Sequence, residues 1–187
     1  MAEIGGAGSE VGVTTRSVSS RHEAGASLLE FALVLPILAA LLLGTVTAAL
    51  AFSNSLSLNN AARETARFGA TLPVDPDMGT WLNQVVDVAI SSATGDLDNG
   101  VPGREVCVAY VHPNGGSADD STTMLTLDDI GNRDIVADGT TCFPDGRPDD
   151  ERRVQVRLVR DADLNVLFFT NTISLTRDST IRFERVP

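Results

Sequence analysis

The sequence Gly25-Ala-Ser-Leu-Leu-Glu30-Phe-Ala-Leu-Val-Leu-Pro36 opens the most informative part of this 187-residue chain. From Phe31 to Phe52 the chain has 22 residues without an ionisable side chain. At ~1.5 Å per residue, a helix of that length is ~33 Å long, which is enough to cross the hydrocarbon core of a bilayer. The stretch therefore predicts a membrane-spanning helix with one carboxylate, Glu30, at its N-terminal end.

Two interpretations of Glu30 follow from its position. An acid deep in the membrane costs up to ~3 kcal/mol and usually has a partner and a function. Alternatively, Glu30 marks the start of the helix, where its side chain reaches the headgroups and is favoured by the positive end of the helix dipole. Position alone does not decide between them.

The spacing around Glu30 resembles a known processing site. Gly25 is followed by four residues, then Glu-Phe and an apolar run, and this pattern is similar to the prepilin peptidase site of type IVb pilins in tight-adherence (Flp) pili. Within that group, the sequence from Leu29 to Pro36 most resembles the TadE-like minor pilins, or pseudopilins. The resemblance implies cleavage between Gly25 and Ala26. Glu30, followed by Phe31, would then be the fifth mature residue, which in that family is thought to pair with the freed amino group of a neighbouring subunit.

Pro36 predicts a distortion of the helix. It lacks a backbone N–H and leaves the carbonyl of Ala32 without its helical partner, so we expect a kink about one turn after Glu30. We hypothesise that this kink loosens the helix for extraction from the bilayer. Unchanged pilus assembly by a Pro36→Ala variant would count against that role.

A second resemblance follows the span. Residues 60–70, Asn-Ala-Ala-Arg-Glu-Thr-Ala-Arg-Phe-Gly-Ala, are similar to the alanine- and arginine-rich continuation of TadE-like proteins just outside the membrane. Small side chains recur there at i, i+4 and i+7: Ala62, Ala66 and Gly69. This spacing predicts a stripe along which another helix packs closely, with Arg63 and Arg67 on another face. A solvated stalk without a partner is the alternative.

The chain is expected to have three parts: a leader over residues 1–25, a transmembrane helix and stalk over 26–72, and an extracytoplasmic domain over 73–187. The last part, of about 115 residues, has room for one small domain. We expect an α+β fold, in which the long N-terminal helix is followed by a pilin-like domain with a second helix and a small antiparallel sheet.

Charge is concentrated in the middle of the chain. Residues 70–151 contain 16 acidic residues and 3 arginines, a net charge of −13. Such a segment repels phosphate backbones, which argues against nucleic-acid binding. Acidic pairs in it offer oxygen ligands for calcium, but none has the register of an EF-hand loop, and solvated loop acids are the commoner meaning. We expect no cofactor and no metal.

Orientation is not decided by positive charge, because two arginines precede the span and two follow it within 15 residues. The cysteines favour one answer. Cys107 and Cys142, alone in a small domain, predict one extracytoplasmic disulfide, which would close a loop of ~35 residues and stabilise the domain by roughly 3–4 kcal/mol. Two buried free thiols are the alternative.

The remaining elements follow from hydrophobic patterns. A second helix should begin near Thr80 and end before the turn at residues 95–100, and residues 104–111 should form a central strand. A short strand is possible around 124–127. Residues 153–160 alternate Val154, Val156 and Leu158 against Gln155, Arg157 and Val159, the pattern of a half-buried strand, and can pair antiparallel with a similar strand at 172–184. The apolar segment Leu164 to Phe169 between them either packs under the sheet or faces a partner.

Enzymatic chemistry has little support. The only histidines are His22, in the leader, and His112, beside a proline, and no zinc-protease, nucleophile-elbow or phosphate-loop motif occurs. The sequence therefore indicates a non-enzymatic, TadE-like minor pilin in the bacterial cytoplasmic membrane, single-pass with its N-terminus cytoplasmic. Expected partners are a prepilin peptidase, other pilin or pseudopilin subunits, the inner-membrane assembly platform and the membrane.

Two other classes remain open. Ala49-Leu-Ala51 satisfies the small-residue rule of signal peptidase, so that the chain would be secreted from Phe52 onward as a soluble binding domain. Alternatively, the helix is never cut and anchors an acidic binding module at the cell surface. The mature N-terminus distinguishes the three.

Overall fold

The structure is a computed structural model that describes residues 20–74, 77–112, 122–147, 151–166 and 169–183; the side chains of residues 20–24, 165, 166 and 169 are outside this description. The expected leader up to residue 19 and the acidic loop at 113–121 therefore lie outside the described residues. The chain divides into two compact units, residues 1–41 and residues 42–187.

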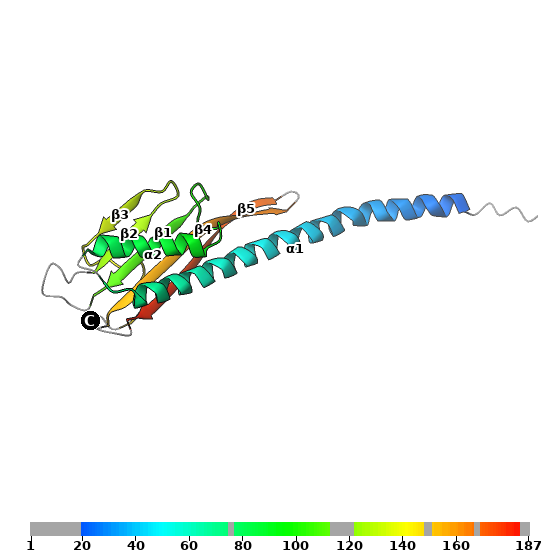
Figure 1. The fold of residues 1–187 in the computed structure, drawn as a ribbon. Helices are drawn as coiled ribbons and strands as arrows, with labels where there is room; N and C mark the ends of the chain where they lie inside the picture. Colours follow the sequence, from blue (N-terminus) through cyan, green and yellow to red (C-terminus); the bar gives the residue numbers. More distant parts are fainter. Residues whose placement is uncertain (1–19, 75–76, 113–121, 148–150, 167–168, 184–187) are drawn as a thin grey trace, which may run out of the picture. The chain divides into compact units, whose positions relative to one another are not determined.

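The long helix predicted around the apolar stretch is present. α1 (Ser20–Thr71) has 52 residues and continues through Pro36 as helix (Figure 1). It contributes to both units. In the second unit its buried side chains are small or aliphatic, which allows the helix to lie close to its neighbours: Leu58, Ala61, Ala62, Thr65 and Ala66.

The second helix is also confirmed. α2 (Met78–Ser92) begins two residues before the expected Thr80, because Asp77 caps it and accepts hydrogen bonds from the backbone N–H of Gly79 and the hydroxyl of Thr80. The hydrogen bond from Thr80 is the main reason that the pKa of Asp77 lies below its ordinary value. The apolar side of α2 is buried through Trp81, Leu82, Val85, Val86 and Ala89.

In the described part of the chain, five strands form one antiparallel sheet, which confirms the expected α+β class. They are β1 (Glu105–Val111), β2 (Thr123–Leu127), β3 (Arg133–Val136), β4 (Arg153–Val166) and β5 (Phe169–Arg182). The order across the sheet is β3-β2-β1-β4-β5, so β1 is central, as predicted, and β2 matches the possible short strand. β3 was not predicted; its four residues are too few to establish an alternating pattern.

The last two strands pair as expected but are longer than expected. β4 and β5 are paired without interruption from Arg153↔Arg182 to Val166↔Phe169. Residues 164–166 and 169, which were expected to lie between the two strands, extend β4 and β5 instead, and residues 167–168 lie outside the described part. Whether the apolar segment packs under the sheet or faces a partner stays a prediction. Seven residues of each strand extend past the end of β1, which pairs with β4 only up to Val159.

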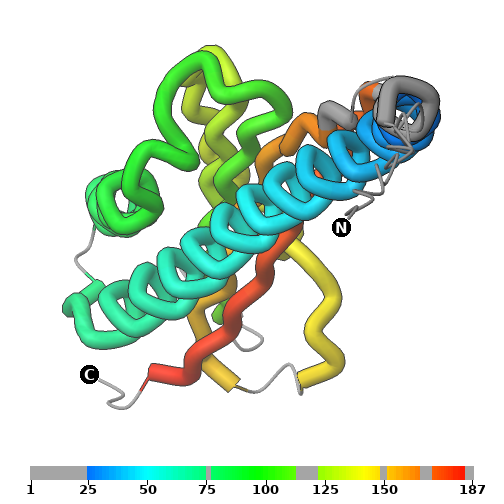
Figure 2. Tube along the Cα trace, turned by 90° about the vertical axis from the view of Figure 1, so that its right-hand side faces the viewer, coloured from blue at the N-terminus to red at the C-terminus, as the bar shows by residue number. Residues whose placement is uncertain are grey.

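The core lies between the sheet and the two helices. Trp81 and Val85 of α2 and Ala66 of α1 belong to the same buried cluster as Val108, Val156 and Leu158 of the sheet. Residues 137–147, yellow in Figure 2, run over the opposite face of the sheet. As a result Gln155, expected on the exposed side of a half-buried strand, is fully buried.

Candidate assembly site on the long helix

The expected processing site lies within α1. Gly25, Ala26, Glu30 and Phe31 are all exposed helical residues. A Cβ atom at Gly25 would meet nothing within 4 Å, so the glycine is not required by packing in this chain. Among the described residues, Glu30 has no hydrogen-bond or ion-pair partner.

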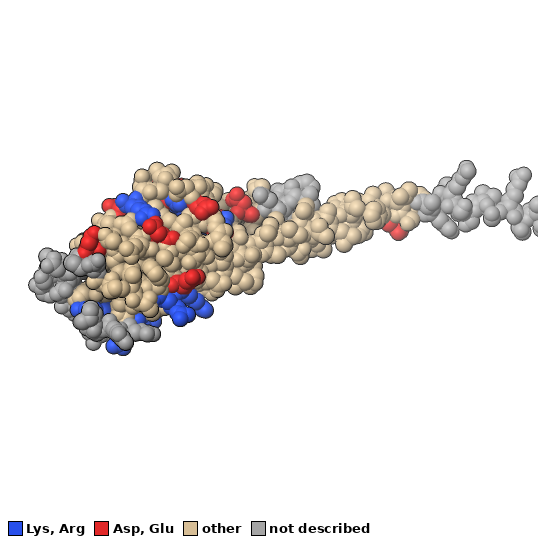
Figure 3. Space-filling view, viewed as in Figure 1, with Lys and Arg blue, Asp and Glu red and all other residues tan. Residues whose placement is uncertain are grey.

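The apolar stretch after Glu30 has the properties of a membrane span. Its mean hydropathy reaches 2.4, and it is the one helix in the described part of the chain that is long and apolar enough to cross a bilayer. In Figure 3 this stretch carries no red or blue side chains. The hydroxyl of Thr45 donates a hydrogen bond to the carbonyl of Leu42, and that of Thr47 donates to the carbonyl of Leu43, so neither hydroxyl is left unsatisfied in lipid.

The small-residue stripe faces the chain's own domain. Ala62 and Ala66 are fully buried, and a Cβ atom on Gly69 would lie 3.2 Å from Val154 and 3.3 Å from Trp81. These positions let α2 and β4 approach α1 closely. Their side chains are therefore covered within this subunit and are not offered to another helix in this conformation.

The exposed side of the same helical section carries charge. Arg63, Glu64 and Arg67 are exposed and line a shallow surface groove with Asn60, Phe68 and Thr71. Neither arginine has an ion-pair partner among the described residues, whereas Arg133, Arg157 and Arg160 in the domain are each paired with an aspartate. This face of α1 is the part of the section that a neighbouring subunit can reach.

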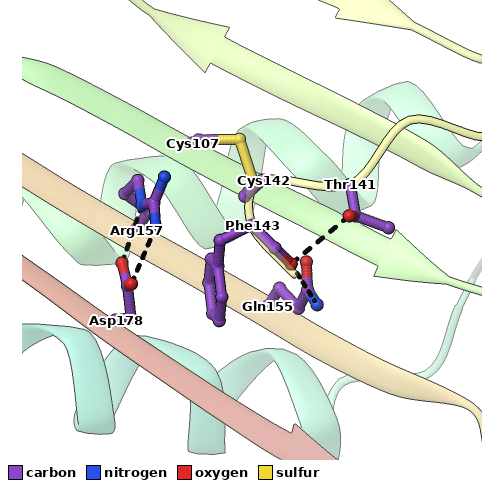
Figure 4. Close-up of a disulfide and its surroundings, with 7 residues drawn as sticks. All are labelled: Cys107, Thr141, Cys142, Phe143, Gln155, Arg157 and Asp178. Atoms are coloured by element: carbon purple, nitrogen blue, oxygen red, sulfur yellow. Dashed lines mark hydrogen bonds and ion pairs between the residues drawn. A yellow bond between two sulfur atoms is a disulfide. The ribbon is translucent and has the colours of Figure 1, made fainter. Parts of the chain in front are cut away.

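The predicted disulfide is present in the domain. Cys107 on β1 and Cys142 are bonded with their Cα atoms 5.8 Å apart, and the bridge holds residues 137–147 against the sheet (Figure 4). Phe143, next to Cys142, lies under the guanidinium of Arg157 at 5.0 Å from the ring centre. Arg157 in turn donates two hydrogen bonds of 2.8 Å to Asp178 on β5. The bridge therefore belongs to a cluster that joins the loop to three strands.

A buried ion pair secures the end of the same loop. Asp145 accepts hydrogen bonds from Arg153 at 2.8 and 3.0 Å and from Gln155 at 2.9 Å. Burial acts to raise the pKa of Asp145. The opposing effects are stronger, so the pKa lies below its ordinary value: hydrogen bonds from the Gln155 side chain, the Arg147 backbone N–H and the Arg153 side chain, and the charge of Arg153. Asp145 is thus held as a carboxylate.

Comparison with known proteins finds a family match for part of the long helix. Residues 25–67 match the family model described as TadE-like protein. Over these residues the chain is TadE-like. No curated protein and no solved structure gave a significant match. The matched segment begins at Gly25 and includes Glu30, the apolar stretch and most of residues 60–70, the alanine- and arginine-rich section. The resemblance inferred from the residues is therefore confirmed.

Sequence reasoning missed two interactions that hold the domain together. It did not find the Asp145–Arg153 pair, because an acid and a base eight residues apart in a loop and a strand have no characteristic spacing. It also missed Arg104, which is 2% exposed and donates to the backbone carbonyls of Leu97 and Asp128. The position of Arg104 directly before an apolar strand was the one feature of the sequence that could have indicated its burial.

Proposed function

We propose that the chain is a membrane-anchored, non-enzymatic minor pilin-like subunit that takes part in assembly of a tight-adherence pilus. The observation that carries the proposal is the TadE-like match over residues 25–67, which includes a glycine, Glu30 and a membrane-length apolar stretch on one continuous helix. In this proposal a prepilin peptidase cuts after Gly25, and the folded domain lies outside the cytoplasmic membrane.

Glu30 supplies the assembly interaction. Its carboxylate offsets the positive charge of a newly formed N-terminal amine on an adjacent subunit, and the exposed apolar residues that follow pack against other pilin helices. An unpaired carboxylate near the hydrocarbon core costs free energy that pairing recovers, so the charge pair favours the assembled state over the isolated chain. The assembly platform in the inner membrane is the expected site of this step.

A charge-removal experiment tests the proposal. Glu30→Gln and the matched control Glu64→Gln are expressed in a pilus-forming strain that lacks the wild-type gene. Both variants should insert in the membrane equally, since neither change makes the helix less apolar. Glu30→Gln should reduce surface piliation and recovery of partner pilins with the subunit, whereas Glu64→Gln, on the exposed face outside the span, should not. Full piliation with Glu30→Gln would contradict the proposed role.

A further inference from the structure

Arg63 and Arg67 differ from the other exposed arginines of the chain. Among the described side chains they are the two exposed arginines without an ion pair, because the others each pair with an aspartate or a glutamate: Arg133, Arg147 and Arg182. Arg63 and Arg67 are four residues apart, so both project from one side of α1, where like charges at this spacing repel each other. We call the surface around these two arginines the basic face of α1.

The rest of the domain has an excess of negative charge. Residues 70–151 alone carry a net charge of −13. Copies of the domain therefore repel one another unless a basic part of one copy faces an acidic part of the next. The basic face of α1 is the surface in the described part of the chain that can accept the acidic surface of a second copy.

A groove between the start of β1 and the β2–β3 turn has the complementary charge. Glu105, Asp128, Asp129 and Asp134 are among the residues that line it, and we call it the acidic groove. Arg104 also lines it but is buried and donates to backbone carbonyls. Asp129 and Asp134 are exposed, and their side chains have no hydrogen bond or ion pair among the described residues. An exposed helix face and a groove are complementary shapes in protein recognition.

The basic face and the acidic groove lie toward opposite edges of the sheet. α1 lies near β4 and β5, where Gly69 is close to Val154 and Ser55 accepts a hydrogen bond from Arg177. The acidic groove lies toward the other edge, which is formed by β3 (Figures 1 and 2). A contact between these surfaces therefore joins two copies. It is heterologous, since each copy contributes a different surface, and it extends from copy to copy in a row or a ring.

The two surfaces also lie at different levels along α1. Trp81 is close to Gly69 of α1 and contacts the ring of Tyr110 on β1, which places these residues at one level. Glu105, beside the groove, is five residues back along β1, or ~17 Å. Ser57 is twelve residues back along α1, or ~18 Å, so the groove lies near the level of Ser57. The middle of the basic face is eight residues past Ser57, so two copies in contact are displaced by ~12 Å along α1.

We propose that the basic face of α1 binds the acidic groove of a second copy of this chain, with Arg63 and Arg67 facing Asp129 and Asp134. Exposed ion pairs add little affinity, so the contact selects the partner and its displacement more than it strengthens the complex. Copies held at equal depth in a membrane do not form it, whereas a copy raised beside another does. The contact goes beyond the proposed pilus role and requires only that two folded copies meet.

Cysteine cross-linking of the full chain tests the contact. Both cysteines of the chain are in the disulfide, so one added cysteine is the sole free thiol. Asn60→Cys, beside the basic face, and Ile130→Cys, in the β2–β3 turn beside the acidic groove, are made in chains with different tags. The two chains are mixed in a neutral detergent at low salt, where a micelle does not hold them at one depth, and treated with a short bismaleimide. Thr176→Cys, at an exposed residue of β5, replaces Ile130→Cys as the matched control.

The expected result is a 60–130 product in clear excess over the 60–176 product. Arg63→Glu with Arg67→Glu in the first chain should lower its yield roughly fivefold, as should Asp129→Arg with Asp134→Arg in the second. The two reversed chains together should restore the yield, because attraction replaces repulsion. All four reversed positions are exposed, so the domain should fold as before.

Three outcomes would overturn the contact: a 60–130 yield no higher than the 60–176 yield, a yield that charge reversal leaves unchanged, or a 60–60 product more abundant than the 60–130 product. The last would show that copies meet through α1 alone. Glu30→Gln in both chains should leave the 60–130 yield unchanged, so the test is separate from the role proposed for Glu30 in the pilus.

Discussion

Gly69 of α1 lies against Trp81 of α2 so closely that a Cβ atom on residue 69 would be 3.3 Å from Cζ2 of the indole. The contact fixes the separation of the two helices over the sheet. The stripe of small residues, which is typical of close helix packing, serves here to pack α1 against α2 and β4 of the same chain.

Gly69→Val should therefore destabilise the domain by overpacking, by about 1–3 kcal/mol. Val154, Trp81 and Val85 would all have to move to admit the side chain. Gly44→Val is the matched control, because a Cβ atom there meets nothing within 4 Å. Thermal unfolding of the purified chain in detergent checks the difference, and equal midpoints for the two variants would contradict this account of Gly69.

Removal of the disulfide should cost roughly 3–4 kcal/mol on the chain-entropy model, because its loop spans 35 residues. The double variant Cys107→Ser with Cys142→Ser should unfold at a lower denaturant concentration than the wild type. Reduced wild-type protein is the control and should behave as the variant does. If reduction leaves the midpoint unchanged, the bridge does not secure the loop.

Asp145→Asn should destabilise the domain by about 1.5–3 kcal/mol at neutral pH, because Arg153 and Gln155 would lose a charged acceptor of their hydrogen bonds. The pKa of Asp145 is lowered in the folded state. The carboxylate's contribution is therefore fully present above the ordinary Asp pKa of about 4 and is lost as the pH falls through the lower, folded value.

The difference between wild type and Asp145→Asn should accordingly shrink when unfolding is measured at successively lower pH below about 4. Asp129→Asn, at an exposed turn residue whose side chain has no hydrogen bond or ion pair among the described residues, is the control and should leave neutral-pH stability nearly unchanged. A difference from Asp145→Asn that is constant down to pH 2 would exclude this titration as its source.

Arg104→Met should also destabilise the domain, by about 1.5–3 kcal/mol, because carbonyls of Leu97 and Asp128 would lose hydrogen bonds from a charged donor. Arg67→Met, on the exposed face of α1, should stay within about 0.5 kcal/mol of wild type. Urea unfolding of the two variants compares a buried with a solvated arginine. Similar losses of unfolding free energy in both would show that burial of Arg104 does not determine its contribution to stability.

Much of the fold was predictable because its signals are local. The apolar stretch after Glu30, the hydrophobic pattern of α2 and the alternation in β1 each lie within one element, and each predicted element is present. The two cysteines predicted the disulfide because a small domain with a single pair has one possible partner for each.

What sequence reasoning missed depends on contacts between distant segments. The alternation in β4 correctly predicted which face of the strand packs in the core. The other face was expected to be exposed, but Gln155 on that face is buried because residues 137–147, held by the disulfide at Cys142, cover it. The full length of β4 and β5 was missed for a related reason: residues 164–169 are apolar enough to suggest packing under the sheet or against a partner. Only the register up to Val166↔Phe169 shows that residues 164–166 and 169 extend the two strands.

The mature N-terminus is the measurement that tests the central claim most directly. Intact mass and N-terminal sequencing of the protein should be determined from membranes of cells that express a tight-adherence prepilin peptidase, with Gly25→Leu as the uncut control. We predict a chain that begins at Ala26 in the wild type, and a full-length chain in the control. A wild-type chain that begins at Met1 or Ala2, or at Phe52, would contradict the account of the protein as a processed pilin-like subunit.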